Sequence, residues 1–103
     1  MDGQLTVRDN VADSAYEAEL DGQVVGRVVY DRRGDRVIVR STVVDPRYRN
    51  RGIGGRLVRA VLDDVAAAGS SLTNYCGFVT DFLAANPEYV RLVDGRFPGR
   101  TPA

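Results

Sequence analysis

The chain has no histidine, no lysine and no tryptophan among its 103 residues, and it has a single cysteine. Without histidine, the ordinary zinc and haem sites and every Ser-His or Cys-His catalytic pair are excluded, so no metal is expected. Without lysine, a P-loop for nucleotide phosphates is excluded. One cysteine cannot form an internal disulfide, which favours a reducing, cytoplasmic location. Proton transfer near neutral pH is left to a shifted carboxylate, the cysteine, a tyrosine, water or a chain terminus.

The composition predicts one globular domain. Its 44% apolar and 27% charged residues are typical of such a domain, and the length allows a core without a disulfide or a metal. The 14 basic residues, all of them arginine, equal the 14 acidic residues in number, which argues against a general nucleic-acid-binding protein. No apolar run approaches the ~20 residues of a membrane span, and no signal-peptide pattern opens the chain, so no membrane partner is expected.

The first 44 residues predict an antiparallel meander. Apolar and polar residues alternate over 14–20, which places Glu17 and Glu19 on the solvent side of a half-buried strand. Asp21-Gly22 is typical of a two-residue hairpin turn, because both of its positions need a positive φ. Further strands are expected near Leu5 and Val7, at 23–30 and at 36–44.

The second half changes to a helical period. One apolar stripe predicts a helix that Gly69 ends: Leu57, Val58, Val61, Leu62, Val65 and Ala66. A short buried strand at 70–75 would then complete a parallel β-α-β unit, which makes the fold α/β with a mixed sheet. A second helix is expected at 77–85, with Phe78 and Phe82 in the core, and a final turn at 87–93. The domain is therefore expected to span residues 1–93, followed by a flexible tail at 94–103.

The segment between the expected strand and helix, residues 43–57, is the strongest candidate for a binding site. It holds Arg49-x-x-Gly52-x-Gly54, and glycines at a helix start let a ligand approach free backbone N–H groups that suit phosphate oxygens. A dinucleotide fingerprint is excluded because Leu57 stands where a third glycine or alanine is needed. The alternative is a glycine-rich turn with solvated arginines.

This segment resembles the acyl-CoA signature of the GCN5-related N-acetyltransferases, Gln/Arg-x-x-Gly-x-Gly/Ala. The resemblance implies an acyl-CoA N-acyltransferase-like fold and acetyl-CoA as cosubstrate. It assigns the pantetheine arm to the backbone of Val43 and Val44. It assigns the coenzyme A pyrophosphate to the loop and helix start that follow: Arg49, Asn50, Arg51, Gly52, Ile53, Gly54, Gly55 and Arg56.

A second block, from Cys76-x-Phe78-Val79 to Asn86-Pro87-Glu88-Tyr89, resembles the C-terminal part of a small single-domain branch of that family. The likeness covers about residues 36–93. The branch has its proposed reactive cysteine where Cys76 stands, and a thiol at a helix N-terminus is favoured as thiolate. The alternative is a buried structural cysteine. Tyr75 and Tyr89 are weaker candidates as proton donors to the leaving thiolate, against an alternative role in core packing.

The chain departs from the branch at two places. Members often carry His and Glu beside the threonine of the strand before the loop, where this chain has Ser41 and Val43 around Thr42. A proline is common two residues before the cysteine, where this chain has Asn74. The leading hypothesis is an acetyl-CoA-dependent N-acetyltransferase with an unidentified amine acceptor. The alternatives are a CoA-binding module with little or no catalysis, and an arginine-lined anion or nucleic-acid contact at 47–59.

Overall fold

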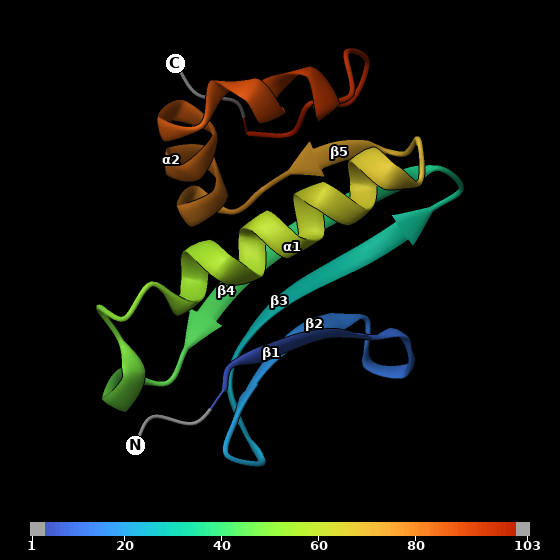
Figure 1. Cartoon of the computed structure of the whole chain (residues 1–103). Helices are drawn as coiled ribbons and strands as arrows, with labels where there is room; N and C mark the ends of the chain where they lie inside the picture. The colour runs from blue at the N-terminus through green and yellow to red at the C-terminus, as the bar shows by residue number, and fades with distance from the viewer. Residues whose placement is uncertain (1–3, 101–103) are drawn as a thin grey trace.

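The computed structural model describes residues 4–100, which form a five-stranded sheet in the order β1-β2-β3-β4-β5 (Figure 1). The strands are β1 (Thr6–Asn10), β2 (Ala15–Leu20), β3 (Gln23–Arg33), β4 (Arg36–Val44) and β5 (Ser71–Asn74). The first four pair antiparallel, and β5 pairs parallel with β4. The expected α/β fold with a mixed sheet is confirmed.

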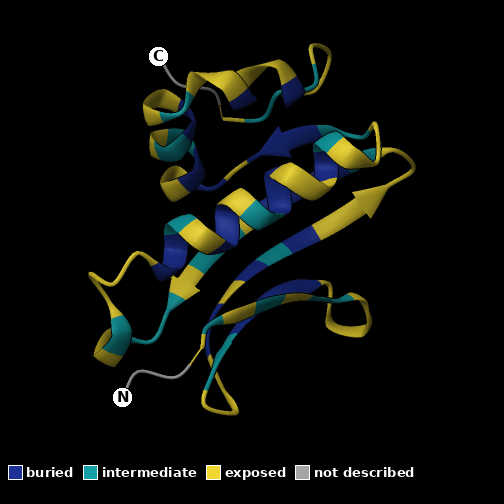
Figure 2. Cartoon of the chain, viewed as in Figure 1, coloured by how far each residue is buried: buried dark blue, intermediate teal, exposed yellow. Residues whose placement is uncertain are grey.

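The described residues also form two α-helices and three 3₁₀ turns. Helix α1 (Ile53–Ala67) joins β4 to β5, and α2 (Gly77–Ala85) follows β5. The turns are η1 (Val11–Asp13), η2 (Pro46–Tyr48) and η3 (Pro87–Leu92). Helix α1 crosses one face of the sheet, and its buried and exposed positions alternate with the helical period (Figure 2). The predicted stripe is buried at Leu57, Val58, Val61, Leu62 and Val65.

Glu17 is buried, with 3% of its surface exposed, so the expectation that it faces solvent is wrong. Its strand position is as expected, on the face away from α1. The neighbouring strands place Arg8 and Arg27 beside it, and each guanidinium lies 3.1 Å from a different carboxylate oxygen of Glu17. The two long side chains cover the carboxylate, which a single-strand pattern cannot predict.

Residues 94–100 lie against β5, although the sequence predicted a flexible tail from residue 94. Parallel bridges join Leu72 to Val93 and Asn74 to Gly99, and the Thr73 hydroxyl donates to the Phe97 carbonyl. These contacts are between backbone groups for the most part, so they leave no periodic signal in the sequence. Residues 101–103 of the expected tail, like residues 1–3 of the expected domain, lie outside the described part of the chain.

Two buried tyrosines donate hydrogen bonds to carboxylates, one that joins the sheet to α1 and one that joins two strands of the sheet. The Tyr16 hydroxyl donates to Asp64 on α1 at 2.8 Å, and the Tyr30 hydroxyl donates to Asp9 on β1 at 2.6 Å. Burial raises the pKa of Tyr16, and the Asp64 carboxylate raises it further. Burial and Asp9 likewise raise the pKa of Tyr30.

We expect the protein to lose stability in alkali because of these tyrosines. A folded-state pKa above the unfolded value of about 10 gives stability that is fully present below that pH and lost as the pH rises toward the folded value. Tyr16→Phe should cost about 1 kcal/mol at pH 8 through the lost hydrogen bond. Its free energy of unfolding in urea should then fall less than that of the wild type between about pH 9 and 11.

Tyr75→Phe is the control, because the Tyr75 side chain is half exposed. This variant should keep the alkaline slope of the wild type. An unchanged slope in Tyr16→Phe would contradict the prediction.

Candidate functional site

Helix α1 begins at a glycine that takes a left-handed backbone conformation. Gly52 has a φ of 77°, and no side chain caps the helix at this end. The N–H groups of the first turn have no partner within the helix, and the helix dipole adds positive potential there. The first turn carries no acidic residue. The start of α1 is therefore suited to an anion.

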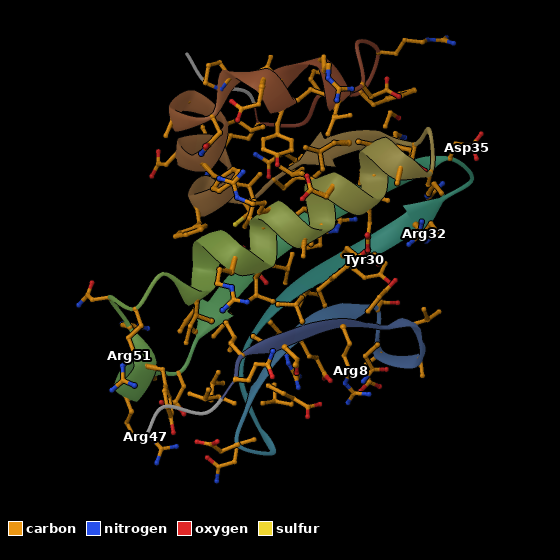
Figure 3. All side chains as sticks on the ribbon, viewed as in Figure 1. Arg8, Tyr30, Arg32, Asp35, Arg47 and Arg51 are labelled. Atoms are coloured by element: carbon orange, nitrogen blue, oxygen red, sulfur yellow. The ribbon has the colours of Figure 1, made fainter. Side chains whose placement is uncertain are left out.

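Arginines lie around this helix start. Arg49 Nε donates to the Val44 carbonyl at 3.4 Å, while Arg47 pairs with Asp45 at 2.9 Å. Hydrogen bonds from Arg47 hold the pKa of Asp45 below its usual range. Figure 3 shows Arg47 and Arg51 on the same lobe, beyond the end of β4. Within residues 4–100, Arg49 and Arg51 have no carboxylate within ion-pair distance, so their charge is available to a ligand.

A cavity of about 490 Å³ opens between the end of β4 and the start of α1. Most of the residues predicted to bind the ligand line it: Val43, Val44, Arg49, Asn50, Gly52, Ile53, Gly54 and Gly55. The predicted residues Arg51 and Arg56 do not line it. Arg56 instead reaches the Leu5 carbonyl, with its Nη2 at 3.4 Å.

The sequence did not assign Phe78, Thr42 or Tyr48 to the cavity, although all three line it. Phe78 was expected in the core, but it is 46% exposed, and this expectation is wrong. Its ring stands against Gly54, where a Cβ would lie 2.8 Å from the Phe78 Cζ. Gly54, the second glycine of the motif, therefore leaves room for the Phe78 ring to form one wall of the cavity. In the sequence, the glycine itself was the signal that something packs closely there.

Strands β4 and β5 separate beside this cavity. Their pairing covers Arg36–Val39 and Ser71–Asn74, and the Tyr75 N–H makes the last contact, to the Val39 carbonyl at 2.9 Å. Beyond it the chain leads away into α2, while β4 continues to Val44 (Figure 1). Residues 40–44 of β4 thus have no strand neighbour on this side. Apart from the Val44 carbonyl, which accepts from Arg49, their backbone N–H and C=O groups on that edge are open to a ligand.

Cys76 lies where the two strands separate. It immediately precedes α2, it is 6% exposed, and its Sγ lies 3.4 Å from Oγ1 of Thr42 on β4. Thr42 lines the cavity and Cys76 does not, so the thiol meets the cavity lining through the Thr42 hydroxyl. The predicted position of Cys76 at the turn from strand to helix is as expected.

The two tyrosines named as proton donors have different surroundings. Tyr75 is 51% exposed, and the Arg40 guanidinium lies 5.4 Å from its ring centre. Tyr89 donates to Asp63 at 2.7 Å and accepts from Arg59, both on α1. The Asp63 carboxylate raises the pKa of Tyr89, and the residue lies outside the cavity lining.

The family of the chain follows from a match over most of its length. The family model described as GCN5-related N-acetyl-transferase matches residues 15–92. The chain belongs to this family. The match includes the four elements that contribute residues to the cavity lining: β4, η2, α1 and α2.

Solved acetyltransferase structures share the fold. The ribosomal-protein-S18-alanine N-acetyltransferase from Escherichia coli superposes with a TM-score of 0.60 at 15% identity, over 70% of this chain and 50% of that chain. N-acetylglutamate synthase from Neisseria gonorrhoeae, complexed with coenzyme A and N-acetyl-glutamate, gives 0.58 at 21% identity, over 71% and 18%. A GNAT family acetyltransferase from Brucella melitensis in complex with acetyl-CoA gives 0.53 at 26% identity, over 59% and 44%.

The chain spans half or less of the length of each of these three proteins. No curated protein matches its sequence. Across residues 4–100, no helix is long and apolar enough to cross a membrane. The same residues contain no group of three or more carboxylate or thiol side chains placed to hold a metal ion.

Proposed function

We propose that the chain binds acetyl-CoA in the cavity between β4 and α1 and transfers the acetyl group to an amine. The observation that carries this proposal is the unpaired edge of β4, which runs from the anion-suited start of α1 to the Cys76 thiol. Acetyl-CoA has a charged diphosphate at one end of its pantetheine arm and a thioester at the other. These two groups match the anion-suited helix start and the thiol at the two ends of the unpaired edge of β4.

The diphosphate binds at the first turn of α1. Its oxygens accept from the free N–H groups of that turn, next to Gly52, whose lack of a side chain allows a close approach. Arg49 adds a guanidinium without a carboxylate partner among the described residues. Arg51, on the same lobe beyond the cavity lining, contributes longer-range attraction.

The pantetheine arm pairs with the backbone of Val43 and Val44, in place of the strand neighbour that β4 lacks there. This pairing carries the thioester toward Thr42. A backbone N–H beside Val44 then donates to the thioester oxygen as negative charge develops on it.

In the direct route, the amine attacks the thioester carbonyl carbon, and the tetrahedral intermediate collapses by breaking the C–S bond. The proton that the amine loses passes to solvent, or by way of Cys76 to the coenzyme A thiolate. In the covalent route, the Cys76 thiolate first takes the acetyl group and releases coenzyme A, and the amine then attacks the new thioester. Both routes require positioning more than they require a strong base.

The second candidate function is a CoA-binding module without catalysis. One observation favours it: the residues that line the cavity include no carboxylate, and the chain has no histidine. No side chain in the cavity lining is thus an evident general base for the amine.

We expect Gly52→Ala to weaken coenzyme A binding about tenfold or more. The added methyl group lies where the diphosphate approaches, and losing one charge-assisted hydrogen bond costs about 1.5–3 kcal/mol. Isothermal titration calorimetry with coenzyme A measures the change in Kd. Gly34→Ala is the matched control, because Gly34 also has a positive φ, at 57°, and open space around it, but lies in the β3–β4 turn.

Equal affinities of Gly52→Ala and Gly34→Ala would contradict this site. An amide-shift titration tests the remaining alternative: if an oligonucleotide moves the signals of residues 52–55 and acetyl-CoA does not, the arginines serve nucleic acid instead.

Turnover separates the two candidate functions. The wild type should release free thiol from acetyl-CoA in proportion to an added amine, measured across a panel of small-molecule and peptide amines. Cys76→Ala should bind coenzyme A normally but lower this rate about 100-fold or more if the thiol carries the acetyl group or a proton. An acetyl adduct on intact wild-type protein, formed without amine, would identify the covalent route. Tight binding with no amine-dependent release would leave only the binding module.

A further inference from the structure

Asn74, the last residue of β5, is a buried polar side chain that connects three parts of the chain. It is 1% exposed. Its Oδ1 accepts from the Cys76 N–H at 2.9 Å, and its Nδ2 donates to the Thr80 hydroxyl at 3.1 Å and to the Arg100 carbonyl at 3.3 Å. One carboxamide therefore joins the residue before α2, the first turns of α2 and the C-terminal segment.

The backbone of Cys76 is held at both of its polar groups. Asn74 fixes its N–H, while the backbone N–H and the hydroxyl of Thr80 both donate to its carbonyl, at 3.0 and 3.2 Å. With the backbone fixed, the side chain directs its Sγ to the Thr42 hydroxyl. The direction of the thiol thus depends on the hydrogen bonds that Asn74 and Thr80 make to the Cys76 backbone.

The C-terminal segment, residues 98–100, is the second partner of Asn74. The Asn74 N–H donates to the Pro98 carbonyl at 3.0 Å, and the Arg100 N–H donates back to the Asn74 carbonyl. Gly99 between them has a φ of 75°, and any Cβ there would collide with the Asn74 backbone. This close approach requires glycine.

We propose that Asn74 is a positioning residue for the Cys76 thiol, and that residues 98–100 control the thiol through it. The inference rests on the proposed function, since it concerns how that site orients its one nucleophile. It is a property of this chain rather than of the branch it resembles, in which a proline commonly stands at this position and has no carboxamide to make the link. The segment expected as a tail thereby becomes part of the site.

Three variants test the proposal. Asn74→Ala removes the link, and Gly99→Ala leaves Asn74 in place but displaces the C-terminal segment. Thr73→Val is the control: Thr73 is buried beside Asn74 and donates to the Phe97 carbonyl, just before residues 98–100, but its side chain has no hydrogen bond to Cys76. The first readout is the rate at which iodoacetamide alkylates the chain's one cysteine, followed by intact mass. The second is the pair kcat and KM for acetyl-CoA.

Asn74→Ala and Gly99→Ala should be alkylated up to about tenfold faster than the wild type. Losing a hydrogen bond lowers the free energy of local opening, which raises the population of the open, reactive form by up to about tenfold. Their kcat should fall about tenfold to 100-fold, with KM within about twofold, because a misplaced group slows chemistry without weakening ground-state binding. Thr73→Val should match the wild type in alkylation.

The proposal is overturned if Asn74→Ala and Gly99→Ala are alkylated no faster than Thr73→Val. If Asn74→Ala does not fold, Gly99→Ala against Thr73→Val decides alone. Failure of the proposed function looks different: the wild type then acetylates no amine, while the alkylation rates still show whether Asn74 holds the thiol.

Discussion

The parallel pairing between β4 and β5 ends after four residue pairs, and the candidate site depends on that ending. Backbone N–H and C=O groups need partners, so a strand that loses its neighbour presents an ordered row of them. The Tyr75 N–H donates to the Val39 carbonyl of β4, and the Asn74 side chain accepts from the next N–H, that of Cys76. Beyond these two hydrogen bonds the chain turns into α2, while β4 continues to Val44. The gap between β4 and the chain that follows β5 thus begins at the hydrogen bonds of the Tyr75 and Cys76 N–H groups.

Close packing sets the dimensions of the opening. Helix α1 approaches β3 at Gly26, where a Cβ would lie 3.1 Å from the Leu57 side chain and 3.2 Å from the Val43 carbonyl. The helix therefore starts directly beside the unpaired part of β4. At the same helix start Gly54 leaves room for the Phe78 ring, so α2 contributes a wall to a cavity otherwise made by β4 and α1. Gly26 and Gly54 therefore allow two close approaches at this end of α1, one to β3 and one to the Phe78 ring.

Local chemistry made much of the fold and the core of the site predictable. The alternating pattern before residue 44, the apolar stripe of α1 and the motif around Gly52 each depend on neighbours in sequence, and the elements lie where those patterns place them. The differences between the expected and the observed structure share one cause. Glu17 is covered by side chains from two other strands, Phe78 packs on a glycine of another helix, and residues 94–100 bind β5 through backbone groups. Such contacts join segments that are far apart in the sequence, so they produce no periodic pattern of apolar residues from which they could be predicted.

Residues 93–100 cover the edge of the sheet and also contact Asn74, the residue that holds the Cys76 backbone. Within the described residues β5 is an outer strand, and an uncovered outer strand invites pairing with other chains. The bridges from Val93 to Leu72 and from Gly99 to Asn74 cover that edge. Asn74 thus takes part in both: its backbone pairs with the C-terminal segment at the edge of the sheet, and its side chain accepts from the Cys76 N–H. The cavity lining has no histidine, lysine or carboxylate, so the proposed acetyl transfer relies on positioning, and in that proposal the edge of the sheet and the thiol depend on one hydrogen-bonded residue.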